Sequence, residues 1–131
     1  MKQRLISATI FTCFFTLLAC NKEAGEGGSS SITGKIYRVE TNVLGDTLEQ
    51  YYAADYDVYI MYGQDDSIYD DKFATSLDGS YQFRNLLPGS YTVFAYTRCD
   101  LCPSGETAVT RDVEITEKGT SVNLEDIVVF K

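Results

Sequence analysis

The stretch that decides the fold runs from Leu77 to Tyr96 and reads Leu-Asp-Gly-Ser-Tyr-Gln-Phe-Arg-Asn-Leu-Leu-Pro-Gly-Ser-Tyr-Thr-Val-Phe-Ala-Tyr. Asp78-Gly79 predicts a tight turn, because glycine reaches positive φ without steric cost and the aspartate side chain can brace the turn. After this turn, and again after Pro88-Gly89, the side chains alternate in the period-2 pattern of a half-buried strand. Two such strands cannot bury their apolar face alone, so we expect the rest of the chain to supply the other half of a sandwich.

Further strands are expected on both sides of this stretch. Alternation and turn signals place them at residues 31–37, 56–62, 68–76, 108–115 and 121–130, with residues 51–54 leading into or edging one of them. About seven short strands at these spacings predict a single all-β, Greek-key β-sandwich over residues 31–131. In the first strand, Ile32 and Ile36 are expected to face the core and Lys35 to face solvent.

The same residues carry a family resemblance. Residues 78–83 followed by 86–93, with Gly34-Lys35-Ile36 as an opening strand, resemble the carboxypeptidase regulatory-like domains and their transthyretin-like and collagen-adhesin B-type relatives. This resemblance implies a prealbumin-like sandwich but little about function, because such domains are mostly modules attached to other activities. Collagen-adhesin B-type relatives join a first-strand Lys to a last-strand Asn by an isopeptide bond. We expect no such bond between Lys35 and Asn123, because Lys35 should face solvent.

The N-terminal residues predict an exported lipoprotein. Residues 1–19 have the form of a signal peptide, with Lys2 and Arg4 before an apolar run that is too short to span a membrane with polar flanks of its own. The run ends in Leu17-Leu18-Ala19-Cys20, which resembles the bacterial lipobox and implies diacylglycerol on the Cys20 thiol. The alternative is an anchor helix in which Cys20 is incidental. Residues 20–30 are rich in Gly and Ser and predict a flexible tether.

The tether also bears on location. Asn21 in place of Asp argues against retention at the inner membrane, if the organism follows the enterobacterial sorting rule. Lys22-Glu23 and Glu26 resemble the surface-export signals of Bacteroidetes lipoproteins, although charges in a solvated tether need no such purpose. We therefore expect an envelope protein held at the outer membrane by the lipid on Cys20, facing either the periplasm or the exterior.

The charge balance restricts the function. Removing Lys2 and Arg4 with the signal takes the net charge from −8 to −10, and the chain has no His. Such an acidic module is a poor ligand for nucleic acid, which needs a basic footprint. A Ser-His-Asp set cannot form without His, and no phosphate-cradling loop or paired-carboxylate motif stands out. We expect a noncatalytic protein without a cofactor.

Cys99 and Cys102 form a Cys-x-x-Cys motif directly after the second strand of the deciding stretch. One interpretation is a thiol–disulfide exchange site, but such motifs work at a helix N-terminus in a βαβ context that this sequence lacks. Zinc is a second interpretation, yet with Cys13 in the predicted signal and Cys20 lipidated the chain offers two cysteines and no His, where a tetrahedral site needs four ligands. We favour a short disulfide closing a loop between strands in an oxidising envelope.

A run of acidic residues, Asp65, Asp66, Asp70 and Asp71, has the hard oxygen ligands that calcium takes. Its spacing does not match an EF-hand loop. We favour solvated charges that blunt a sheet edge, and we expect no metal site.

Tyrosines are dense in one segment, at Tyr51, Tyr52, Tyr56, Tyr59 and Tyr62. Exposed Tyr rings can stack on sugars, although rings on a sandwich are more often core and cross-strand pairs. Our leading hypothesis is a lipid-anchored structural or protein-interaction module at the outer membrane. The competing hypothesis is a surface glycan- or peptide-binding lipoprotein working with an outer-membrane transporter through Tyr51, Tyr52, Tyr56 and Tyr59. A lesser alternative is envelope thiol–disulfide exchange through Cys99 and Cys102.

Overall fold

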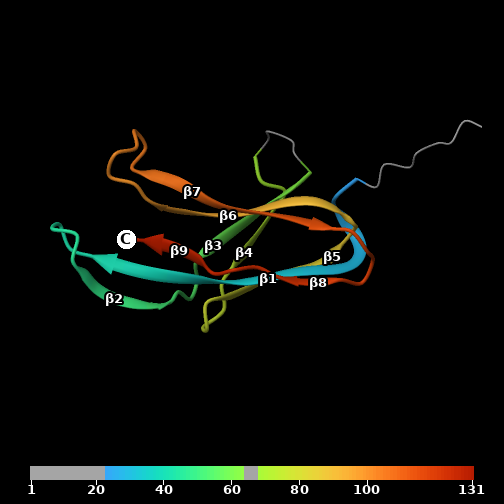
Figure 1. Ribbon diagram of the computed structural model, residues 1–131, viewed down its shortest axis with the longest axis horizontal. Coiled ribbons are helices and arrows are strands. Elements are labelled where there is room, and N and C mark those ends of the chain that lie inside the picture. The colour runs from blue at the N-terminus through green and yellow to red at the C-terminus, as the bar shows by residue number, and fades with distance from the viewer. Residues whose placement is uncertain (1–22, 64–67) are drawn as a thin grey trace, which may run out of the picture.

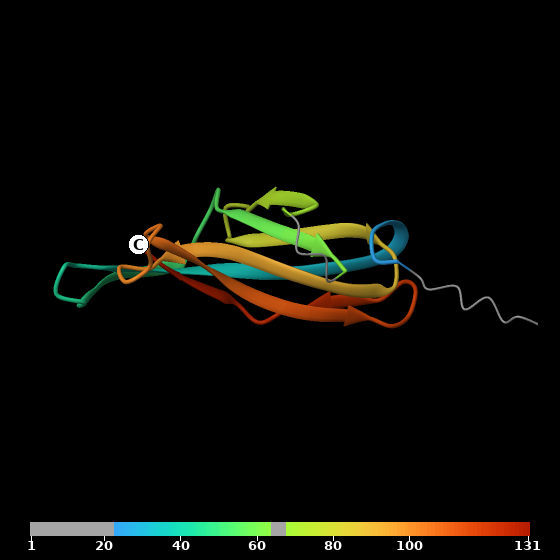
Figure 2. The same ribbon diagram turned by 90° about the horizontal axis from the view of Figure 1, so that it is seen from above.

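The computed structural model describes residues 23–63 and 68–131, and every regular element in them is a β-strand. The strands are β1 (Glu26–Thr41), β2 (Thr47–Tyr52), β3 (Asp57–Tyr62), β4 (Asp71–Ala74), β5 (Ser80–Leu86), β6 (Gly89–Arg98), β7 (Glu106–Ile115), β8 (Ser121–Asn123) and β9 (Ile127–Phe130). They form two sheets, which confirms the predicted all-β sandwich (Figures 1 and 2). These residues hold nine strands where about seven were expected, because β2 is a separate strand where residues 51–54 were expected only to lead into or edge another, and because residues 121–130 divide into β8 and β9. Within the same residues, no helix is long and apolar enough to cross a membrane.

The long strand β1 is the centre of the first sheet and is paired along both edges. One edge pairs antiparallel with β5 and then β2, and the other pairs parallel with β8 and then β9. The segments next to β5 and β2 meet at Ile36, whose N–H donates to the Gly79 carbonyl and whose carbonyl accepts from the Ala53 N–H, both at 3.0 Å. Gly79 has a φ of 77°, so the turn predicted at Asp78-Gly79 is confirmed and lies against the middle of β1.

The second sheet has the order β4-β3-β6-β7, with every pair antiparallel. β5 and β6 therefore belong to different sheets, and the corner at Pro88-Gly89 carries the chain from one layer to the other. The expectation that these two strands make one half of the sandwich, opposite the rest of the chain, is corrected by this topology. Tyr81 of β5 and Tyr91 of β6 are both buried, since each strand turns its apolar face into the same core.

The core is made by the period-2 alternation of both sheets. Ile32 and Ile36 are fully buried, as predicted, and full burial of each such side chain contributes about 1.5–3 kcal/mol to folding. The other large buried side chains are Val58, Ile60, Tyr81, Phe83, Leu86, Tyr91, Val93, Ile115, Ile127 and Val129.

The segment before the predicted domain is part of the sandwich. β1 begins at Glu26, whereas the tether was expected to continue to residue 30. Gly25 accepts a backbone hydrogen bond from Leu87 (2.8 Å), and its own N–H donates to the Tyr91 hydroxyl (3.0 Å). A Cβ at Gly28 would lie 1.9 Å from the Leu86 carbonyl oxygen, so only glycine permits this close approach. Composition indicated flexibility here, but the small residues serve backbone packing.

Candidate functional site

The four tyrosines proposed for binding do not gather on one face. Tyr51 and Tyr52 lie in β2 of the first sheet, whereas Tyr56 and Tyr59 lie before and within β3 of the second sheet. The two pairs therefore have to be judged separately, by whether their rings and hydroxyls are already engaged within the protein.

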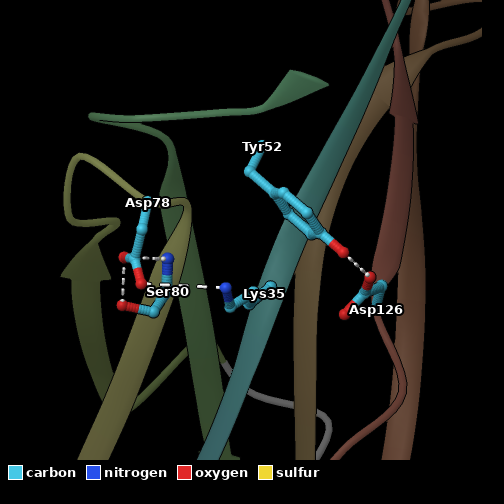
Figure 3. Close-up of polar contacts among 5 residues, drawn as sticks. All are labelled: Lys35, Tyr52, Asp78, Ser80 and Asp126. Carbon is cyan, nitrogen blue, oxygen red and sulfur yellow. Dashed lines mark hydrogen bonds and ion pairs between the residues drawn. The ribbon is translucent and has the colours of Figure 1, made fainter. Parts of the chain in front are cut away.

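Tyr52 is engaged on its ring and on its hydroxyl (Figure 3). The Lys35 ammonium lies 4.7 Å from the ring centroid, and the hydroxyl donates to the Asp126 carboxylate at 3.0 Å. This hydrogen bond is the main cause that raises the Tyr52 pKa. Lys35 is held at its other side by Asp78 at 3.7 Å, and Asp78 accepts hydrogen bonds from Ser80. These contacts leave Tyr52 little to offer a ligand.

Tyr51 is engaged in a similar way. Its hydroxyl donates to Glu40 at 2.7 Å, and the Arg38 guanidinium lies 5.9 Å from its ring centroid. The hydrogen bond to Glu40 is the largest cause that raises the Tyr51 pKa. The structure thus explains both exposed tyrosines of β2 as parts of local polar networks.

The outer face of the second sheet carries an aromatic cluster centred on Tyr59. The Tyr59 ring stacks on Phe94 with centroids 5.2 Å apart and lies 4.6 Å from Tyr69 and 5.6 Å from Tyr96. Phe94 is buried beneath the cluster, whereas Tyr96 is 44% exposed. The strand register produces this cluster, since Tyr59 pairs directly with Phe94 across β3 and β6.

Beside this cluster lies an open depression of about 520 Å³. It combines three tyrosines with three acidic residues: Asp55, Tyr56, Asp57, Tyr59, Tyr96 and Glu106. The Tyr56 hydroxyl donates to the Tyr96 carbonyl, which fixes the Tyr56 ring at the wall, and Asp57 is paired with Lys72 at 3.2 Å. We call this surface the aromatic depression.

Several polar groups of the aromatic depression have no internal partner. Within residues 23–63 and 68–131, the Tyr59 and Tyr96 hydroxyls and the Asp55 and Glu106 carboxylates make no hydrogen bond or ion pair. A Tyr hydroxyl is protonated at neutral pH and can donate a hydrogen bond, and burial raises the Tyr59 pKa further in the same direction. Fixed aromatic rings next to unengaged donors and acceptors are what a small-molecule site requires. Tyr96 and Glu106 were not singled out from the sequence. The two-residue spacing of Phe94 and Tyr96 could have indicated an aromatic outer face.

The predicted disulfide is present. Cys99 and Cys102 are bonded, with Cα atoms 5.3 Å apart, in the loop between β6 and β7. The Cys99 N–H donates to the Gly105 carbonyl at 2.8 Å, which closes the hairpin tip. Thiol–disulfide exchange through this pair remains a prediction.

The remaining predicted sites lie partly outside the described residues. Cys20, Asp65 and Asp66 are among those outside. Asp70 accepts a hydrogen bond from the Tyr62 N–H at 2.6 Å, and the part of the chain that is described holds no group of three His, Cys, Asp or Glu side chains suited to a metal ion.

The predicted orientation of Lys35 is confirmed. Its side chain is 41% exposed and is paired with Asp78, while the Asn123 side chain accepts a hydrogen bond from Thr33. Lys35 and Asn123, between which no isopeptide bond was expected, are thus each engaged with a different neighbour.

No family model and no curated protein matches the chain. Among solved structures, it is similar to a Pseudomonas aeruginosa protein described as a "putative carbohydrate binding protein", with 13% identity and a TM-score of 0.48. That alignment covers 82% of this chain and 92% of the other. Similarity at this level carries no inference about function, which has to come from the site itself.

Proposed function

We propose that this protein is a noncatalytic, lipid-anchored envelope module that binds carbohydrate in the aromatic depression. The observation that carries the proposal is the set of unengaged hydroxyls and carboxylates at Asp55, Tyr59, Tyr96 and Glu106, arranged around exposed aromatic surface. For an acidic chain without His, this arrangement fits recognition better than catalysis.

Carbohydrate is the ligand class that matches these groups. Tyr rings offer an apolar face with a polar tip, suited to the C–H face and the hydroxyls of a sugar ring. Ionised carboxylates only accept hydrogen bonds, so Asp55 and Glu106 would accept them from sugar hydroxyls. Three acidic residues in one depression would repel acidic polysaccharides. The proposed ligand is therefore a neutral or amino sugar.

The anchor and the family belong to the same proposal. Cleavage before Cys20 and lipid on its thiol would hold the domain at the bacterial outer membrane, where a glycan-importing transporter is a suitable partner. Membership of the carboxypeptidase regulatory-like group is proposed on the residues that resemble it, which include Gly34-Lys35-Ile36 within β1, and a two-sheet sandwich is compatible with that group. In that group, too, a sandwich without catalytic residues would serve as a recognition module.

Binding is tested with Tyr96→Ala against Tyr52→Ala as the matched control. Both replace an exposed Tyr on an outer sheet face, but only Tyr96 lines the aromatic depression. A panel of neutral, amino and acidic polysaccharides is screened by calorimetry. We expect Tyr96→Ala to weaken binding at least about tenfold, or ~1.4 kcal/mol, and Tyr52→Ala to leave it unchanged. Equal losses in both variants, or no binding by the unchanged protein, would refute the proposal.

A second candidate function, protein interaction, is favoured by two hairpin tips at one end of the molecule (Figure 1). Val43, Leu44 and Leu101 are almost fully exposed there. The Asn42 side chain accepts from the N–H groups of Leu44 and Asp46, both at 2.9 Å, so this turn displays its aliphatic residues in a fixed conformation. Crosslinking in cells that is lost in Val43→Ser/Leu44→Ser, but retained in Tyr96→Ala, would establish this role.

A further inference from the structure

The first described residues of the sandwich are fixed at one end of the molecule, close in sequence to the proposed lipid. Tyr91 is buried, and its hydroxyl bonds to the N–H of Gly25 at 3.0 Å and to the Leu87 carbonyl at 2.5 Å. The Ser30 hydroxyl donates to the Glu117 carbonyl at 3.2 Å, which ties β1 to the β7–β8 turn. Ala24 lies against Gly89, where a Cβ would come within 2.8 Å of it. We call this the clamped end; it comprises residues 24–30, 86–89 and 117–120.

The clamped end limits how far the sandwich can stand from the membrane. Only residues 21–23 separate Cys20 from Ala24, and an extended chain spans at most about 3.6 Å per residue, or ~14 Å over these four steps. The predicted tether of residues 20–30 would have allowed more than twice that reach. A lipid on Cys20 therefore brings the clamped end to the membrane surface.

The aromatic depression lies far from the clamped end. β6 begins at Gly89 beside Ala24 and reaches Tyr96 seven residues later, which at about 3.3 Å per residue places Tyr96 ~23 Å along the strand. Figure 1 shows the N-terminal segment beside β5 and the β7–β8 turn, and the β1–β2 and β6–β7 tips at the opposite end. Figure 2 shows the same elongated arrangement from above.

Charge opposes a sandwich that lies flat on anionic lipid. The net charge without the signal is −10, after loss of Lys2 and Arg4 from a chain of −8. Surface charges act over a Debye length of about 8 Å at physiological salt, so a domain with this net charge is repelled when its long sides approach anionic head groups. Short attachment at one end and repulsion along the sides together favour an upright domain.

We propose that the sandwich stands on the membrane by its clamped end and presents the aromatic depression away from the bilayer that anchors it. The inference rests on the proposed lipidation and deepens the proposed function. The ligand would be a soluble or wall-borne glycan of neutral or amino sugars, not a glycolipid head group of the same membrane.

The test is energy transfer in vesicles of phosphatidylethanolamine and phosphatidylglycerol that carry the lipidated full chain and an acceptor on the lipid head groups. A fluorescent amino acid replaces Lys118 at the clamped end or Leu44 at the opposite tip, both exposed. The sixteen residues of β1 correspond to about 50 Å, so we expect transfer from position 118 to exceed that from position 44 at least ~3-fold. A control with twenty Gly-Ser residues inserted after Asn21 should lower transfer from position 118 and reduce this ratio.

The outcomes separate the two proposals. Equal transfer from both positions in a lipidated chain, or a ratio that the insertion leaves unchanged, would overturn the upright arrangement while leaving carbohydrate binding intact. A chain whose mass shows no diacylglycerol on Cys20 would overturn the anchor and the upright arrangement together. Loss of carbohydrate binding in solution would be seen with the unanchored protein, so it is judged independently of orientation.

Discussion

The free energy of unfolding should change in opposite directions when the hydroxyl of Tyr81 or that of Tyr91 is removed. Tyr81 and Tyr91 are 2% and 1% exposed, so their rings are equivalent in burial. The Tyr91 hydroxyl bonds to Gly25 and Leu87 at the clamped end. The Tyr81 hydroxyl is buried without a partner in the described part of the chain, against Gly34.

The magnitudes follow from these environments. Tyr91→Phe removes at least two hydrogen bonds, each contributing about 0.5–1.5 kcal/mol, and leaves the Gly25 N–H unpaired, so we expect a loss of about 2–3 kcal/mol. Tyr81→Phe removes an unsatisfied group whose burial costs about 1–3 kcal/mol, so we expect a gain of about 1 kcal/mol.

The assay is urea unfolding of the chain without residues 1–20, followed by far-UV circular dichroism because the protein has no Trp. Tyr59→Phe is the control, since its hydroxyl has no partner in the described residues and the ring is only half-buried; it should change stability by less than about 0.5 kcal/mol. If Tyr81→Phe destabilises as much as Tyr91→Phe, the reasoning from unsatisfied polar groups is wrong.

Three further predictions follow from the described contacts. Burial raises the Tyr81 pKa to about 12, so between pH 10 and 12 the unfolded chain loses a proton that the folded chain keeps, and stability falls as the pH rises. Tyr81→Phe should remove up to ~1.4 kcal/mol of this loss per pH unit, which would be measured as a smaller shift of the urea midpoint with pH. Cys99→Ser/Cys102→Ser should lower stability by no more than about 2 kcal/mol, because the closed loop is so short; a larger shift in melting temperature than this implies would contradict it. Gly79→Ala, at φ 77° with atoms 2.8 Å from the new Cβ, should cost at least ~1 kcal/mol more than Gly45→Ala, at φ 88° with open space, in the same unfolding assay.

Period-2 alternation predicted which side chains are buried, because successive residues of a strand point to opposite faces whatever the strand pairs with. Ile32 and Ile36 are buried as expected, and Tyr81 and Phe83, which share one face of the alternating run after the Asp78-Gly79 turn, are buried too. Alternation carries no information about sheet membership. The corner at residues 88–89 looks the same in sequence whether it turns back within a sheet or crosses to the other layer.

Composition misplaced the start of the domain for a different reason. Gly and Ser are typical of linkers. Gly28, however, is required because the Leu86 carbonyl lies where the Cβ of any other residue would be. The Ser30 hydroxyl is buried and hydrogen-bonded to the β7–β8 turn. Both contacts join residues far apart in the chain, so no local pattern could have indicated them.

The candidate site also depended on contacts between residues far apart in the chain, which the sequence does not show. Tyr density pointed to residues 51–59, yet a Tyr is available to a ligand only if its neighbours leave it so. The Lys35 ammonium lies over the Tyr52 ring, and the Tyr52 hydroxyl is bonded to Asp126, which is 74 residues away. Tyr59 is held by Phe94, which the register of β3 and β6 brings beside it.

The fixed position of the Tyr59 ring makes the aromatic depression a better candidate for ligand binding than the tyrosines of β2. Contacts with Phe94, Tyr69 and Tyr96 restrict this ring before any ligand arrives. Ordering a mobile side chain on binding costs about 0.5–1.5 kcal/mol, and a ring already held in place avoids that cost. Tyr52 would instead have to give up its contacts with Lys35 and Asp126. A hydroxyl without an internal partner on a preorganised ring, beside carboxylates that also have none, therefore supports the proposed site at the second sheet over one at the first.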